Sequence, residues 1–246
     1  MSALGPRAAF VILIAAILTM SAMTIDINLP AIPATASAFD TSLTKAQLSV
    51  SLFFLGFAAG QAFFGPLSDR YGRRPVLILG IIGYLAATMA CALASSIDTL
   101  LAGRLVQGVA AASGPILGRA IIRDRFEGAE MARVMSLVLA AFITAPLVAP
   151  SIGALVLEVG SWRAIFWFLA IYGGLLLVLV SVFLEESLQA PDRGALSPVR
   201  LIGAYRAVLC DPGSRRYSAI VVMGLAMLLI YLVTGSPIFM STYGLS

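Results

Sequence analysis

The sequence lacks histidine altogether and contains one lysine and two cysteines, and these absences exclude several chemistries. Without histidine, imidazole relays and histidine metal sites are impossible, and two separated cysteines, Cys91 and Cys210, provide neither a zinc site nor a disulfide framework. No glycine-rich loop precedes Lys45, which excludes a phosphate-binding P-loop, and nothing resembles a serine nucleophile elbow. We therefore expect no enzyme, no cofactor and no metal site.

Charge is also scarce. Charged residues make up 11% of the chain and hydrophobic residues 60%, whereas soluble domains have about 25% and about 45–50%. So little polar surface predicts a protein of the lipid bilayer, where a helix of about 20 residues crosses the hydrocarbon core. The period-two alternation of membrane strands is absent. Apolar runs of sufficient length lie at 8–29, 46–67, 75–94, 99–121, 131–157, 162–184 and 217–240. The sequence thus predicts an all-α, polytopic membrane protein with seven spanning helices.

The basic residues fall at alternate ends of these predicted helices. Positive residues in short loops stay on the cytoplasmic side of a membrane. One set of ends carries Arg7, Arg70, Arg73, Arg74, Arg119, Arg123, Arg125, Arg133, Arg193, Arg200, Arg206, Arg215 and Arg216. The opposite ends carry only Lys45 and Arg163. We therefore expect a cytoplasmic amino terminus, and we attribute the positive charge to this bias rather than to a nucleic-acid partner.

Two features of the chain's organisation follow from polar residues. A cleavable signal peptide is the alternative interpretation of the first apolar run, although that run exceeds the usual core of about 7–15 residues and contains Asp26. The longest polar stretch, 185–216, contains several helix breakers and predicts a cytoplasmic linker. Within it, a helix that begins at Pro198 has an apolar face suited to the membrane surface.

Residues 65–74, GPLSDRYGRR, concentrate glycine, acid and base between the second and third apolar runs. In a loop, Gly65 and Gly72 permit close approach and a tight reversal, and Asp69 can cap a helix or form an ion pair. The anchoring cations are Arg70, Arg73 and Arg74. An ordinary positively charged loop is the alternative interpretation.

This loop motif resembles the cytoplasmic loop that identifies the major facilitator superfamily of transporters. The resemblance implies that Arg73 pairs with Asp124 at the end of the fourth helix, and that Asp69 contacts a helix of a second half. It also implies twelve helices in two halves around a central cavity.

The fourth apolar run contains LAGRLVQG at 101–108, which resembles the superfamily's second motif, associated with proton coupling. Burying Arg104 costs on the order of 2.5 kcal/mol or more, so it needs a partner or a wet cavity, unless it extends to the outer surface. Asp26 lies at a similar depth and is the candidate partner; a solvated helix cap is its alternative role. A carboxylate beside an arginine can exchange a proton for a substrate. The predicted substrate and proton-coupling residues are Asp26, Asn28, Arg104 and Gln107.

The fifth apolar run contains APLVAPSIG at 145–153. Pro146 and Pro150 remove backbone hydrogen bonds, and the small residues up to Gly153 leave a smooth face, although simple helix bending explains the same residues. The pattern resembles the antiporter motif of the bicyclomycin and chloramphenicol resistance (Bcr/CflA) group of drug exporters. Residues 26–33, 162–167 and 236–239 are similar to the same group.

This resemblance implies proton-coupled efflux of drug-like small molecules across the bacterial inner membrane. It predicts an N-terminal six-helix bundle at 1–184, the linker at 185–216, and the first helix of an incomplete C-terminal bundle at 217–246. The small faces around 56–60 and 146–153 are expected to lack partners within this chain, so a missing C-terminal half or self-association is the expected partner. A truncated, non-transporting half that acts as a scaffold is the alternative. A seven-helix receptor gives no reason for the loop motif, and a retinal pump needs a lysine in its last helix.

Overall fold

The structure, a computed structural model, describes residues 6–192, 194–224 and 226–227, which form helices and no strands. The chain divides into two compact units, Met1–Arg193 and Gly194–Ser246. The all-α, membrane-spanning class predicted from the sequence is confirmed. The domain boundaries at 184 and 216 remain a prediction.

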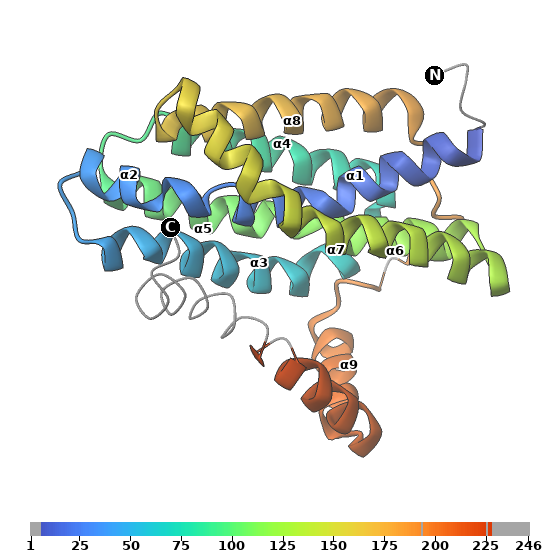
Figure 1. Cartoon of the computed structure of the whole chain (residues 1–246). Helices are drawn as coiled ribbons and strands as arrows, with labels where there is room; N and C mark the ends of the chain where they lie inside the picture. Colours follow the sequence, from blue (N-terminus) through green and yellow to red (C-terminus); the bar gives the residue numbers. More distant parts are fainter. Residues whose placement is uncertain (1–5, 193, 225, 228–246) are drawn as a thin grey trace. The chain divides into compact units, whose positions relative to one another are not determined.

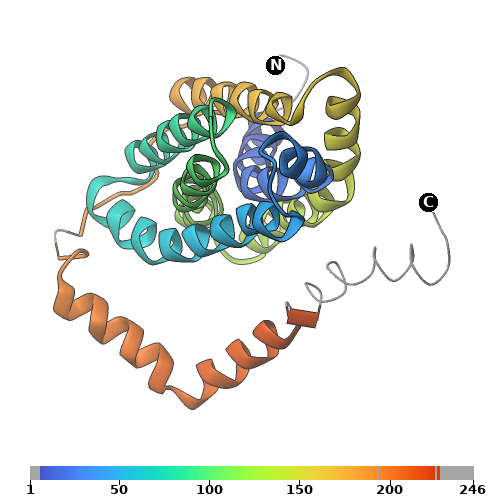
Figure 2. The ribbon, with the colours of Figure 1, turned by 90° about the vertical axis from the view of Figure 1, so that its left-hand side faces the viewer.

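The first unit is a bundle of long helices with short connections (Figure 1). Its elements are α1 (Pro6–Asp26), η1 (Leu29–Ala31), α2 (Ile32–Ala38), α3 (Leu43–Tyr71), α4 (Arg73–Ala92), α5 (Ile97–Ala111), α6 (Ser113–Arg125), α7 (Gly128–Val159) and α8 (Trp162–Phe183). Figure 2 shows α3, α4, α7 and α8 around the outside, with α1 and the α5–α6 pair between them. The elements that carry Asp26 and Arg104 are therefore the inner ones.

Within the described residues, six helical segments are long and apolar enough to cross a membrane. They match the first six predicted runs, and α5 and α6 together form the fourth segment, interrupted at Ala112. Local signals explain several ends: the Ser42 side chain accepts a hydrogen bond from the Lys45 amide, and Ser96 and Thr99 form a capping box at α5. The predicted seventh run, 217–240, lies mostly outside the described residues.

Glycines bring α3 and α5 into close contact. A Cβ atom on Gly56 would collide with the Leu105 carbonyl oxygen, and one on Gly108 would collide with the Phe53 carbonyl oxygen. A Cβ atom on Gly60 would likewise collide with the Val109 carbonyl oxygen. The prediction that the face at 56–60 lacks a partner within the chain is therefore wrong, because this face forms the α3–α5 crossing.

The small face of α7 packs against the end of α1. Ala145, Ala149 and Gly153 are buried, and a Cβ atom on Gly153 would collide with the Ile27 carbonyl oxygen. Pro146 is exposed, Pro150 is half-buried, and α7 continues through both prolines. The expectation that this face is unpartnered is thus wrong for its small residues, which hold α7 against the segment that follows Asp26.

The second unit contains α9 (Pro198–Cys210) and a further helical stretch at 212–224. As predicted, α9 begins at Pro198, which follows the N-cap residue Ser197. Several of its apolar side chains are exposed within the described structure, including Ile202 and Leu209. That this helix rests on a membrane surface stays a prediction.

Candidate functional site

The loop motif forms a helix, a one-residue turn and another helix. α3 continues to Tyr71 and α4 begins at Arg73, so the expectation that residues 65–74 form a loop is wrong. Gly72 alone turns the chain, with φ at 101°, a conformation that side chains disfavour. The predicted close approach at Gly65 is also wrong, since a Cβ atom there would meet no described atom within 4 Å.

Arg73 is the centre of a charged cluster that joins three helices. Its side chain is only 5% exposed. Nη1 donates to the Ser68 hydroxyl over 2.7 Å and to the Asp69 carboxylate, while Nε donates to Asp124 Oδ2 over 2.9 Å. The Arg73–Asp124 pair implied by the resemblance is therefore confirmed. A guanidinium held by two carboxylates locks the ends of α3, α4 and α6 together.

Glu186, which sequence reasoning missed, caps the same turn. Its carboxylate accepts hydrogen bonds from the backbone amides of Arg73, over 2.9 Å, and Arg74, over 3.1 Å. These amides belong to the first turn of α4, where an acceptor and a negative charge are both favourable. A Cβ atom on Gly72 would also lie 2.6 Å from Glu186 Oε2, which gives a second reason for glycine there.

The rest of the segment after α8 follows Glu186 across the turn. The Ser187 hydroxyl donates to Asp124 over 3.2 Å, and the Asp192 amide donates to the Asp69 carbonyl over 2.9 Å. Residues 185–192 therefore pack against the ends of α3, α4 and α6 within the first unit, although the sequence assigned them to the linker. The sequence signal for this contact is Glu185 and Glu186 directly after the sixth apolar run, and two adjacent acids do not show which residues they contact.

The remaining cations of the motif have separate roles. Arg74 Nη2 donates to the Ser181 carbonyl of α8 over 2.7 Å. The Arg70 guanidinium lies 5.3 Å from the centre of the Tyr71 ring, a cation–π contact. The contact of Asp69 with a second half stays a prediction.

Arg104 lies in the interior of the bundle, fully buried. Its Nη1 donates to Gln107 Oε1 over 2.7 Å and to the Thr24 carbonyl over 3.4 Å, and its Nε donates to the Ser49 carbonyl over 3.3 Å. The Phe53 ring centre is 4.7 Å from the guanidinium carbon. The alternative that this side chain extends to the outer surface is excluded by its burial.

A polar chain continues from Gln107. Its amide nitrogen donates to the Thr88 hydroxyl over 2.7 Å, and that hydroxyl donates to the Tyr84 carbonyl over 2.6 Å. The Tyr84 hydroxyl lies 2.8 Å from the Thr24 hydroxyl on α1. The buried network therefore connects α5, α4 and α1.

The predicted ion pair between Asp26 and Arg104 is not formed in the described part of the chain, whose ion pairs lie elsewhere. The guanidinium instead binds backbone carbonyls and Gln107, including the Thr24 carbonyl two residues before Asp26. Asp26 is the last residue of α1 and is half-buried. Asn28 is buried, and its Oδ1, like Arg104 Nη2, has no hydrogen-bond partner among the described residues. The coupling roles of all four residues remain a prediction.

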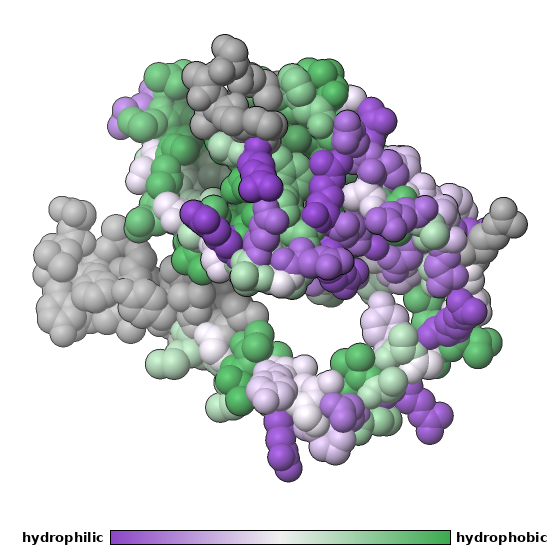
Figure 3. All heavy atoms as spheres, turned by 90° about the vertical axis from the view of Figure 1, so that its right-hand side faces the viewer, coloured by the Kyte–Doolittle hydropathy of each residue, from purple (hydrophilic) through white to green (hydrophobic). Residues whose placement is uncertain are grey.

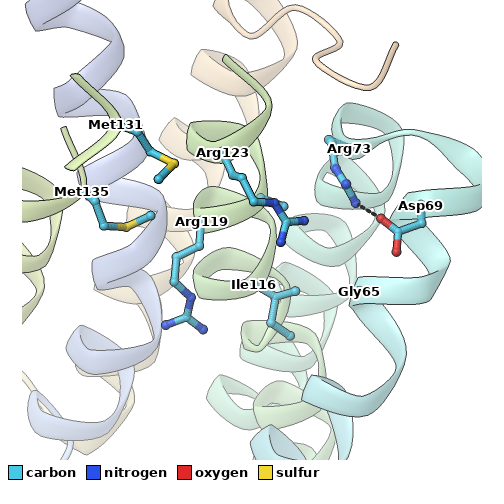
Figure 4. A pocket seen from close by; sticks show the side chains of 9 residues that line it. Gly65, Asp69, Arg73, Ile116, Arg119, Arg123, Met131 and Met135 are labelled. Atoms are coloured by element: carbon cyan, nitrogen blue, oxygen red, sulfur yellow. Dashed lines mark hydrogen bonds and ion pairs between the residues drawn. The ribbon is translucent and has the colours of Figure 1, made fainter. Parts of the chain in front are cut away.

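Hydrophilic side chains gather at the end of the first unit that holds the α6–α7 junction (Figure 3). At this end a pocket of about 430 Å³ lies beside the Arg73 cluster (Figure 4). It is lined by Gly65, Asp69, Arg73, Ile116, Arg119, Ala120, Arg123, Met131 and Met135.

Comparison with known proteins agrees with this architecture. The family model described as Major Facilitator Superfamily matches residues 12–246. The chain belongs to this superfamily, whose members are transporters rather than enzymes.

Several bacterial relatives are similar to the chain. It is 36% identical over 189 residues to an uncharacterized MFS-type transporter, YdgK, of Bacillus subtilis, covering 76% of this chain and 47% of the relative. It is 33% identical over 177 residues to the bicyclomycin resistance protein homolog of Haemophilus influenzae, covering 72% and 44%. It is 38% identical over 165 residues to a chloramphenicol resistance protein of Pseudomonas aeruginosa, covering 67% and 39%. The resemblance to the bicyclomycin and chloramphenicol resistance group is confirmed, and the chain spans about half the length of these relatives.

Solved structures share the fold. The human organic anion transporter MFSD10 superposes with a TM-score of 0.59 at 20% identity, covering 80% of this chain and 54% of that one. A D-xylose–proton symporter superposes with a TM-score of 0.64 at 16% identity, covering 92% and 56%.

Proposed function

We propose that this chain is part of a carrier that exports drug-like small molecules in exchange for protons. The similarity to a bicyclomycin resistance homolog and a chloramphenicol resistance protein supports the substrate class. Arginine placement supports a bacterial inner-membrane protein with its amino terminus and the Arg73 cluster on the cytoplasmic side.

The observation that carries the proposal is the complete burial of Arg104 without a carboxylate partner among the described residues. Charge inside a membrane protein is expensive and marks substrate and proton pathways. Arg104 of α5 donates a hydrogen bond to the Thr24 carbonyl and so connects the last turn of α1 to α5. Asp26 ends that same turn, so its protonation changes the charge of the segment that Arg104 holds. A charge change of one unit at Asp26 then shifts the balance between the states of the carrier.

We further propose that transport requires a second bundle. Carriers of this kind rock two halves about a site near the midplane, and the first unit provides one such half. The second bundle is a C-terminal half or another copy of the chain. A scaffold without transport activity is the competing function.

Drug uptake into inverted vesicles tests these proposals. We expect no proton-dependent chloramphenicol accumulation with residues 1–246 alone, and accumulation when a fragment supplying helices eight to twelve is coexpressed. In the complemented carrier, Asp26→Asn should abolish the dependence on the proton gradient and Arg104→Ala should impair uptake. Asp98→Asn, at an exposed carboxylate paired with Lys45, is the matched control and should be neutral. Normal coupled uptake by Asp26→Asn, or robust uptake by the chain alone, contradicts the respective proposal.

A further inference from the structure

Two arginines of α6, Arg119 and Arg123, line the pocket beside the Arg73 cluster. They are four residues apart, so they occupy one face of the helix, one turn from each other. Figure 4 shows both side chains between the methionines of α7 and the Arg73–Asp69 pair. The pocket therefore presents two guanidinium groups from one side.

These two positive charges are not neutralised by the protein. Asp69 is the one carboxylate among the lining residues, and it already pairs with Arg73. Within the described residues, neither Arg119 nor Arg123 takes part in an ion pair. Like charges at this spacing repel each other, so a bound anion would stabilise the arrangement.

The general excess of arginine at this end of the bundle does not explain the pocket. Some arginines here have carboxylate partners, since Arg7 pairs with Glu130 at 3.5 Å and Arg125 pairs with Glu185 at 3.6 Å. The exposed Arg133 has none among the described residues, but it does not line the pocket. Arg119 and Arg123 are exposed, and what distinguishes them is that both line the same pocket. The two guanidinium groups are therefore available to bind an anionic ligand in this pocket.

The pocket's remaining walls define the rest of the ligand. Met131 and Met135 lie on the side of the arginines away from the Arg73–Asp69 pair, and Ile116 of α6 adds an apolar wall between them (Figure 4). Methionine adapts to irregular shapes, and guanidinium forks match the geometry of carboxylates and phosphates. A volume of about 430 Å³ lies within the range of small-molecule sites, roughly 300–1,000 Å³.

We propose that this pocket binds an amphiphilic anion, with its carboxylate or phosphate between Arg119 and Arg123 and its apolar part against Ile116, Met131 and Met135. The site is separate from the Arg104 network and does not depend on which drug the carrier exports. On the proposed topology it faces the cytoplasm, so the anion is either a soluble compound or the headgroup of an anionic lipid.

Two binding measurements on the purified 246-residue chain distinguish these sources. In phosphatidylcholine nanodiscs, phenyl phosphate is titrated by calorimetry. In detergent, adducts of phosphatidylglycerol and of phosphatidylcholine are compared by native mass spectrometry. Arg119→Gln and Arg123→Gln remove one cation each. Arg133→Gln is the matched control, because Arg133 is an exposed arginine on neighbouring α7 that does not line the pocket.

We expect roughly tenfold weaker binding in Arg119→Gln and Arg123→Gln, because a hydrogen-bonded charged partner is lost, and no change in Arg133→Gln. If the two glutamine variants bind phenyl phosphate more weakly, the natural ligand is a soluble anion. If they bind only phosphatidylglycerol more weakly, it is a lipid headgroup. Binding of neither probe to the wild-type chain, or an equal loss in Arg133→Gln, overturns the proposal. If the glutamine variants do not fold, the lysine variants Arg119→Lys and Arg123→Lys decide. Weakened binding in them supports the guanidinium site, and unchanged binding overturns it.

Discussion

Gly72 shows how much of the Arg73 cluster depends on a single backbone conformation. At φ 101° and ψ 151° it turns the chain between α3 and α4 without an intervening loop. The turn places the first amides of α4 at the Glu186 carboxylate and the Arg73 side chain between Asp69 and Asp124. A side chain at position 72 therefore disturbs the backbone and the cap together.

We predict that Gly72→Ala destabilises the first unit by about 1–3 kcal/mol, because this backbone region is almost exclusive to glycine. The measurement is the thermal unfolding midpoint of the purified chain in detergent. Gly65→Ala is the control, because a Cβ atom there meets no described neighbour within 4 Å and alanine favours the helix. Equal destabilisation of both variants would show that the turn conformation is not responsible.

The residues of this cluster were predictable to different degrees. Gly72, Arg73 and Asp69 lie in one short motif, and the Arg73–Asp124 pair followed from the family resemblance. The contact of Glu186 with this turn was not predicted, because Glu186 lies 113 residues from Arg73 and no local pattern connects them. Arg104 was predicted to need a partner within the membrane, but its partners were not identified, because backbone carbonyls such as those of Ser49 and Thr24 carry no sequence signal.

At the scale of helices, the apolar runs were predicted well and their contacts were not. Five of the six described membrane segments agree with the predicted runs to within a few residues, because length and hydropathy determine them. The first segment extends to Ala38, nine residues beyond the end of its predicted run. A small face, however, shows only that some helix can approach closely. The faces at Gly56 and Gly153 were therefore expected to seek outside partners, whereas α5 and the end of α1 occupy them.

We predict that Gly56→Ala and Gly108→Ala each destabilise the α3–α5 crossing by about 1–3 kcal/mol, since each added methyl group meets a backbone carbonyl that cannot rotate away. Lowered unfolding midpoints in detergent provide the measurement. Gly83→Ala serves as the comparison, because its nearest neighbour, the Ala110 Cβ atom, would lie 3.6 Å away, an ordinary contact. Midpoints for the two crossing variants that equal that of Gly83→Ala would contradict this account.

At the scale of the whole molecule, the distribution of charge predicts orientation. The α3–α4 and α6–α7 junctions and the segment after α8 lie at the end rich in arginine, whereas Lys45 and Asp98 pair at 2.9 Å at the beginnings of α3 and α5. Positive residues are retained in the cytoplasm during insertion. The Arg73 cluster is thus expected inside the cell.

Labelling in intact cells tests this orientation. On a background without Cys91 and Cys210, cysteines at the exposed Tyr71 and Ala190 should resist a membrane-impermeant thiol reagent, whereas one at the exposed Leu43 should react. After permeabilisation all three should react. Labelling of position 71 or 190 from outside would reverse the proposed topology.

The return of residues 185–192 to the α3–α4 turn bears on how this bundle is produced as a separate fragment. A polypeptide that stops at residue 184, where the sixth apolar run ends, lacks the Glu186 cap, the Ser187 contact with Asp124 and the Asp192 contact with Asp69. One that stops after residue 192 retains all three. A fragment of the first unit is therefore expected to need eight residues beyond the sixth apolar run, in a stretch that a boundary based on hydropathy alone would leave out.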